Sequence, residues 1–361
     1  MFGRMMNNYY YGKSGKGDFR KEDLPETRSQ LFRDTLRTRL SALCRLNLLY
    51  MLVWLPAMIV IMMSAMNMYS TLTNFALIQD NNYPAYVEMM QNSGVENVIS
   101  EEEFGSLVSQ KDELGTYMNS TLRASLTRLL LWLIPCIAIT GPFTAGLSYV
   151  TRNWARDEHA FVWTDFKDAV RENWKQALVI SAVTGFLPLA VYEGWSFYGE
   201  MASQNMILII PQVLVILVGL IWAISVTYMY PIIVTYELKM KDVLRNGLLL
   251  GVARLPFSVG IRLLHCVPAL IFFAAVWFFG LDLMIGLMIL GGYYMLIGFS
   301  LSRFITASYT NAVFDRFINA RIEGAKTNQG LRPKEDDDFD DEGEEAEDQK
   351  PDEKTNDGGE S

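Results

Sequence analysis

The sequence predicts an all-α fold, a polytopic membrane bundle of six transmembrane helices with the N and C termini both in the cytoplasm. Two observations predict it. Six charge-poor apolar runs are long enough to cross a hydrocarbon core about 30 Å thick, which takes about 20 helical residues. Lys and Arg residues also alternate between frequent and rare in the segments that separate these runs. Together the observations indicate a multi-pass protein whose first partner is the lipid bilayer.

The apolar runs define the expected spans. They cover residues 46–68, 129–150, 177–198, 206–229, 257–279 and 283–302. Each is expected to be a helix, because backbone groups in lipid must form their hydrogen bonds within the segment. The third run is the weakest, since Gly185, Pro188 and Glu193 interrupt it. Without this run the chain would cross five times and its ends would lie on opposite sides.

The basic residues decide between five and six spans. Ten Lys or Arg residues lie in 1–45, two in 69–124, five in 152–175, none in 199–205, four in 237–256, none in the link around Asp282 and five in 303–332. In membrane proteins the cytoplasmic segments carry the excess of basic residues. The unbroken alternation therefore predicts six spans, and it places both termini in the cytoplasm.

Four regions follow from this topology. Residues 1–45 form a cytoplasmic basic arm with an amphipathic helix, which either lies on the anionic inner leaflet or extends the first span. Residues 46–303 form the six-helix transmembrane domain, whose external insertion at 69–124 is either a structural cap or a ligand or partner surface. Residues 304–325 form a cytoplasmic helix. Residues 326–361 form an acidic tail that is too polar to fold, and it either solubilises the protein or docks a basic partner.

Composition excludes several function classes. The net charge of −9 resides in the last 28 residues, which carry −12, so the rest of the chain is near +3 and no nucleic-acid partner is expected. The three Cys do not form a metal-type pair, and only two His are present. A Met cluster late in the first run is interpreted as lipid-facing or core side chains rather than as a copper(I) site. Because catalytic elbows, phosphate-binding loops and zinc motifs are missing from the sequence, we expect no enzyme activity, no cofactor and no metal.

Four ionisable residues within the spans are candidate functional residues, because charges inside a membrane are costly. Arg128 and Glu193 lie near the outer ends of their helices and could pair. Arg262 and His265 are three residues apart and share a face of the fifth helix, although Arg262 could instead snorkel to the inner headgroups. The four residues do not form a chain across the membrane, so a proton relay is not expected.

A distinctive motif surrounds the end of the second span. Gly141, Ala145 and Gly146 are small residues at near four-residue spacing, which lets helices approach closely, and Pro142 is expected to kink the helix. These residues are therefore interpreted first as architectural. With related short motifs elsewhere, the full set is Asn47, Gly141, Pro142, Ala145, Tyr149, Arg152, Arg156, Glu158, Lys175, Pro231 and Asn246.

This set of motifs resembles the YesL-like family of bacterial membrane proteins, a domain of unknown function numbered 624. The resemblance covers roughly residues 40–300, and the long external insertion, the basic arm and the acidic tail depart from it. It implies a multi-pass protein of the bacterial plasma membrane with a non-enzymatic accessory or regulatory role in carbohydrate uptake of the ABC type. ABC transporter permease subunits, or further copies of the chain, are the partners that it implies.

Two other hypotheses stay open. The first is a small-solute transporter or channel, because prolines recur in the spans and broken helices can line transport cavities. The four ionisable span residues would serve such a path. The second is an intramembrane enzyme, for which the sequence offers no set of catalytic residues.

Overall fold

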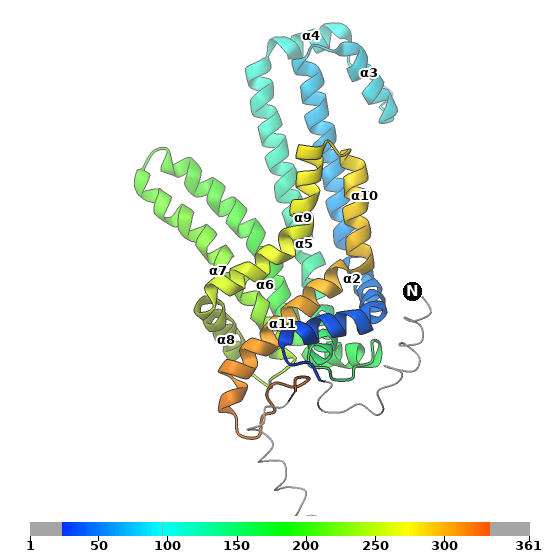
Figure 1. The fold of residues 1–361 in the computed structure, drawn as a ribbon. Helices are drawn as coiled ribbons and strands as arrows, with labels where there is room; N and C mark the ends of the chain where they lie inside the picture. Colours follow the sequence, from blue (N-terminus) through cyan, green and yellow to red (C-terminus); the bar gives the residue numbers. More distant parts are fainter. Residues whose placement is uncertain (1–23, 96, 333–361) are drawn as a thin grey trace, which may run out of the picture. The chain divides into compact units, whose positions relative to one another are not determined.

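The computed structural model describes residues 24–95 and 97–332, and in these ranges it is built from helices and contains no strand (Figure 1). The long helices are α2 (Arg28–Gln79), α5 (Lys111–Trp154), α6 (Thr164–Ala202), α7 (Ile209–Ile233), α9 (Leu255–Phe279) and α11 (Phe299–Phe317). The shorter ones are α3 (Tyr83–Asn92), α4 (Glu101–Ser109), η2 (Met206–Leu208), α8 (Met240–Ala253), α10 (Leu283–Tyr293), the π-helical turn η3 (Tyr294–Gly298) and η4 (Asn319–Arg321).

The predicted all-α fold with six spans is confirmed. Within the described residues, six helical segments are long and apolar enough to cross a membrane, and the weak third run lies in one of them. The sixth segment, Ile285–Arg321, is not a single regular helix, since η3 separates α10 from α11. The cytoplasmic placement of the termini stays a prediction.

The chain divides into two compact units, which are described separately. The bundle unit comprises residues 41–152 and 160–307. In its described part, the terminal unit comprises residues 24–40, 153–159 and 308–332. The expected basic arm up to residue 23 and the acidic tail from residue 333 lie outside the described residues.

Close packing of α5 against α6 organises the bundle unit. A Cβ added at Gly141 would collide with the carbonyl oxygen of Ala177 and with Ser181, and one at Gly146 would lie 2.8 Å from the carbonyl oxygen of Phe166. Ser181 also donates a hydrogen bond of 2.7 Å from Oγ to the carbonyl oxygen of Ala138. In a membrane, helix association relies on such close packing and on hydrogen bonds between helices. Gly141 and Gly146 thus lie at the close contact between α5 and α6.

Asn47 joins α2 to the irregular part of the sixth span. Its Nδ2 donates to the carbonyl oxygens of Tyr294 and Met295, both at 2.8 Å, and its Oδ1 accepts from the backbone N–H of Ser300 at 3.0 Å. A π-helical turn disturbs the regular α-helical hydrogen bonds, and buried backbone groups need partners. Asn47 is fully buried and supplies them.

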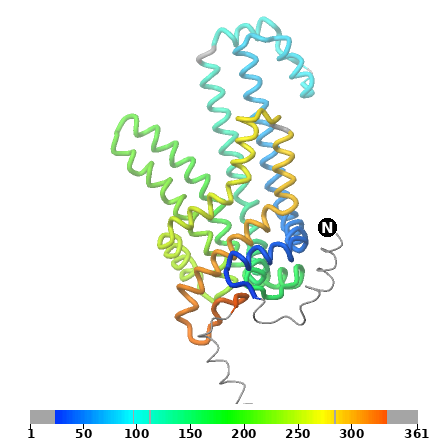
Figure 2. The backbone as a smooth tube through the Cα atoms, viewed as in Figure 1, coloured from blue at the N-terminus to red at the C-terminus, as the bar shows by residue number. Residues whose placement is uncertain are grey.

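Residues 69–124, the insertion that the sequence predicts to be external, are mostly helix in their described part. α2 continues into it and α5 begins within it, which leaves α3 and α4 as the segment between their ends (Figure 2). Phe104 of α4 is 1% exposed and packs against the rings of Tyr83 and Tyr86 with centroid separations of 5.3 and 5.1 Å. Ser100 and Glu103 form a capping box at the start of α4. The insertion therefore has a small apolar core of its own.

The terminal unit is held together by Asp315. This carboxylate accepts hydrogen bonds from Arg28 Nη2 at 2.6 Å, from Asn319 Nδ2 at 2.7 Å and from the backbone N–H of Asn328 at 3.1 Å. Arg332 adds a contact of 2.7 Å to Glu26. Charge-assisted hydrogen bonds are stronger than neutral ones. The described start of α2 is thus tied to the end of α11 and to the segment that follows it.

Candidate ligand-binding cavity

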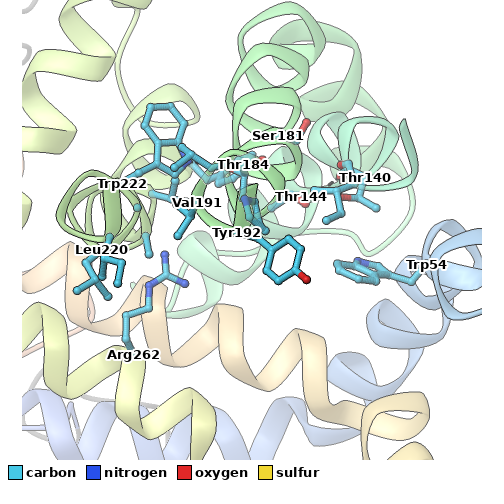
Figure 3. Close-up of a pocket in the computed structure, with 18 of the residues that line it drawn as sticks. Trp54, Thr140, Thr144, Ser181, Thr184, Val191, Tyr192, Leu220, Trp222 and Arg262 are labelled. Atoms are coloured by element: carbon cyan, nitrogen blue, oxygen red, sulfur yellow. Dashed lines mark hydrogen bonds between the residues drawn. The ribbon is translucent and has the colours of Figure 1, made fainter. Parts of the chain in front are cut away.

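The bundle unit contains a cavity of about 790 Å³. Residues of α2, α5, α6, α7, α9 and α11 line it, and Figure 3 shows side chains of the first five of these helices converging on it. The lining residues are Tyr50, Trp54, Ile137, Thr140, Thr144, Ser181, Thr184, Leu187, Pro188, Val191, Tyr192, Trp195, Ile216, Gly219, Leu220, Trp222, Ala223, Val226, Tyr230, Arg262 and Arg303. A mostly apolar cavity with a few convergent polar groups is the usual form of a small-molecule site.

Hydroxyl groups of α5 and α6 give the cavity wall a set of acceptors. Thr140 Oγ1 donates to the carbonyl oxygen of Ile137 at 2.8 Å, and Thr184 Oγ1 donates to that of Ile180 at 2.7 Å. Such local bonds allow Ser and Thr to sit in an apolar helix. Because the hydroxyl hydrogens are used within the helix, the oxygens offer lone pairs, and Thr184 accepts from Trp222 Nε1 at 3.0 Å.

Two arginines supply the charge of the cavity. Arg262 extends from α9 toward the side where Leu220 and Trp222 of α7 lie (Figure 3). The Arg303 guanidinium carbon lies 5.0 Å from the centroid of the Tyr230 ring, a cation–π arrangement. None of the described residues that line the cavity is acidic. The site is therefore electropositive.

A second, smaller cavity of about 170 Å³ shares both arginines. His265 lines it, and His265 Nε2 lies 3.1 Å from the carbonyl oxygen of Ser302 and 3.3 Å from Thr306 Oγ1. The structure thus brings Arg262 and His265 to one region, as their spacing predicts.

The other candidate pair is not formed. Glu193 accepts a hydrogen bond of 2.6 Å from Thr127 Oγ1 and lies 3.9 Å from Arg123 Nη2, and the ion pairs among the described residues do not include Arg128. Arg123 and Thr127 are four residues apart and share a helix face, whereas Arg128 follows on another face. The structure therefore does not show the possible pairing of Arg128 with Glu193. Arg128 instead lines a separate hollow with Asn67 and Thr71.

The remaining motif residues lie in packing and loop positions. Ala145 and Pro231 are buried, Tyr149 and Asn246 are half-buried, and Pro142 is half-buried within α5. In the terminal unit Arg156 Nε lies 3.5 Å from Glu158, while in the bundle unit Lys175 lies over the ring of Trp174. Arg152 is half-buried in the last turn of α5.

Most of the cavity cannot be recognised from the sequence. Arg303 follows the last apolar run, where its position indicates only a basic flanking residue, although it lines the cavity. Trp54, Tyr192 and Trp222 are aromatic residues in apolar runs, where nothing separates a cavity wall from a lipid-facing side chain. Among the described residues no group of three His, Cys, Asp or Glu could hold a metal ion. The groups present suit binding through charge, stacking and hydrogen bonds.

The six spans and the cavity within them define a multi-pass integral membrane protein. Residues 126–194 match the family model described as "Protein of unknown function, DUF624". The resemblance to the YesL-like family is thereby confirmed over this segment.

One curated relative supports the same conclusion. The "Uncharacterized protein YesV" of Bacillus subtilis (strain 168) is 26% identical over 153 residues, which cover 40% of this chain and 72% of the relative. No solved structure matches. The matched segment 126–194 includes the close-packed parts of α5 and α6 and one wall of the cavity, whereas Arg262 and Arg303 lie outside it.

Proposed function

We propose that this chain is a non-enzymatic accessory or regulatory component of ABC-type carbohydrate uptake in a bacterial plasma membrane. One observation supports the proposal above the others. Within the segment that matches the family model, Gly141 and Ser181 join two helices rather than assemble a nucleophile, a base or a metal site. A segment that builds a scaffold is suited to positioning a partner. The link to carbohydrate uptake rests on the YesL-like resemblance.

Co-purification tests the proposal. The full chain, with an affinity tag and expressed at its native level, would be crosslinked in cells, extracted in mild detergent and analysed by mass spectrometry. We expect permease subunits of an ABC-type carbohydrate importer to be enriched over a similarly tagged, unrelated six-span protein. Recovery of the chain alone, or only with further copies of itself, would contradict the proposal.

A matched pair of variants separates a specific contact from general membrane association. Gly141→Leu should disturb the packing of α5 against α6 and reduce recovery of the importer, because a side chain there meets the backbone of α6. Gly260→Leu should leave recovery unchanged, since the space beside Gly260 on α9 is open. Equal recovery with both variants would show that the α5–α6 scaffold does not present the partner surface.

A second candidate function is transport of a small solute by the chain itself. The observation that favours it is the cavity of about 790 Å³, which residues from several spans surround. Reconstitution in proteoliposomes would reveal flux of the solute. If flux survived replacement of Arg128, Glu193, Arg262 and His265 together, the version that relies on these residues would be excluded.

A further inference from the structure

The structure assigns the cavity of the bundle unit as a binding site for an anionic, hydroxylated ligand, whose carboxylate or phosphate is held between Arg262 and Arg303. This inference does not depend on the proposed accessory role. It concerns what the chain binds rather than which protein it assists.

The positive charge of the cavity is not neutralised by an acidic side chain among the described residues that line it. Arg262 and Arg303 line both the larger and the smaller cavity, and the described lining residues of the two cavities include no Asp or Glu. Neither arginine takes part in an ion pair among the described residues, and Arg262 Nε is buried without a hydrogen-bond partner. An unpaired charge within a membrane protein is costly, so such residues mark binding sites or pathways. A bound anion would remove the cost.

The guanidinium groups are suited to a carboxylate or a phosphate. Arg presents a planar fork of N–H donors that matches these anions with two parallel hydrogen bonds. Stacking over the Tyr230 ring, with 5.0 Å between the guanidinium carbon and the ring centroid, orients Arg303 without using its donors. The donors therefore remain available to a ligand.

The rest of the cavity indicates the body of the ligand. Thr140 and Thr184 donate their hydroxyl hydrogens to their own helices, so toward the cavity they act as acceptors. Acceptors on the wall require donors on the ligand, and hydroxyl groups are the simplest. Trp54 and Trp222 add flat apolar faces against which a carbon skeleton can pack. At about 790 Å³ the cavity has room for a hydroxylated anion with an attached apolar part.

Two kinds of molecule combine an anionic group with hydroxyl groups in this way. One is an anionic phospholipid, in which a phosphate carries a glycerol headgroup. The other is a soluble acidic sugar, in which a carboxylate is attached to a ring of hydroxyl groups. The experiment therefore has two arms that use the same protein variants.

The first arm measures retained lipid. The full chain is reconstituted in nanodiscs that contain an equal mixture of phosphatidylglycerol and phosphatidylcholine, released in the gas phase and examined by native mass spectrometry. The second arm measures the shift in melting temperature, in a detergent without a sugar headgroup, on titration with D-glucuronate and, as the neutral control, D-glucose. The variants are Arg262→Gln, Arg303→Gln, the double variant and Arg245→Gln, whose residue is exposed on α8 and outside both cavities.

We expect one arm to report binding that the wild type and Arg245→Gln share and that the double variant loses. Losing one charge-assisted contact should weaken binding by roughly tenfold or more. Selective retention of phosphatidylglycerol would identify the lipid source. Stabilisation by D-glucuronate and not by D-glucose would identify the soluble source. Equal behaviour of the wild type and the double variant in both arms would overturn the inference.

The melting temperature of each variant without ligand shows whether a loss of binding results only from a loss of folding. Because Arg262 Nε has no hydrogen-bond partner and Arg303 is a like charge at the same cavity, Arg262→Gln should melt at the same temperature as the wild type or above it. A large fall in its melting temperature would show that Arg262 is a structural residue, and this too would overturn the assignment.

Discussion

A single amide side chain compensates for an irregular turn inside the sixth span. Asn47 donates to two carbonyl oxygens of η3 and accepts from the backbone N–H of Ser300, and it is fully buried. In lipid these groups would find no water to replace the lost partner. In the sequence, Asn47 is one polar residue in an apolar run. In the structure it forms three hydrogen bonds to groups about 250 residues further along the chain.

We predict that Asn47→Leu lowers the free energy of unfolding by about 2–4 kcal/mol, because each buried group left without a partner costs roughly 1–3 kcal/mol. Asn67→Leu is the matched control, since Asn67 lies on the same helix and is exposed. Unfolding in mixed micelles, followed by circular dichroism, measures both variants. If Asn47→Leu unfolds like the wild type, the hydrogen bonds to η3 do not stabilise the fold.

We also predict that Gly141→Ala destabilises the bundle by about 1–3 kcal/mol, the usual cost of overpacking. A methyl group there would collide with the carbonyl oxygen of Ala177, and a backbone atom cannot turn away as a side chain can. Gly260→Ala, where the added methyl meets open space, should have no such cost. Thermal melting of the two purified variants checks the difference, and equal melting temperatures would refute the tight α5–α6 contact.

At the scale of elements, local patterns predict the spans well and their contacts poorly. Hydropathy is a property of neighbouring residues, so the run at 177–198 could be placed in a helix despite Pro188 and Glu193. The partner of Glu193 depends on which faces of two helices meet, so the sequence makes Arg128 a possible partner where the structure shows Thr127 and Arg123. The cavity depends on six helices at once, so its aromatic wall could not be separated from lipid-facing residues in the sequence.

The insertion behaves as an element with its own core, so it should be possible to loosen it without unfolding the bundle. Phe104→Ala removes the ring that packs against those of Tyr83 and Tyr86, and large-to-small changes of buried aromatic residues cost about 3–5 kcal/mol. We expect faster hydrogen exchange across α3 and α4 and little change in α5 beyond its first turns. Tyr117→Ala, at a side chain that is 69% exposed, is the control. Faster exchange throughout the spans would contradict an independent core.

At the scale of the whole molecule, the distribution of Lys and Arg predicts that both termini are cytoplasmic. A variant without Cys44, Cys136 and Cys266 would carry one new Cys, either Ser93→Cys in the insertion or Lys326→Cys near the C terminus. We expect a membrane-impermeant maleimide to label the first in intact cells and the second only after permeabilisation. Labelling of Lys326→Cys in intact cells would reverse the topology.

Because of the π-helical turn at Tyr294–Gly298, the number of residues in the sixth span decides where its later side chains point. Each residue of an α-helix advances the side chains by about 100°, and a π-turn accommodates one residue more than an α-turn. Deleting a single residue from this turn would let α10 run into α11 as a regular helix and would swing every later side chain to a new direction. Arg303 would then leave the cavity although no charge had been removed. The direction of Arg303, and with it the charge of the cavity, is in this sense set by helical phase.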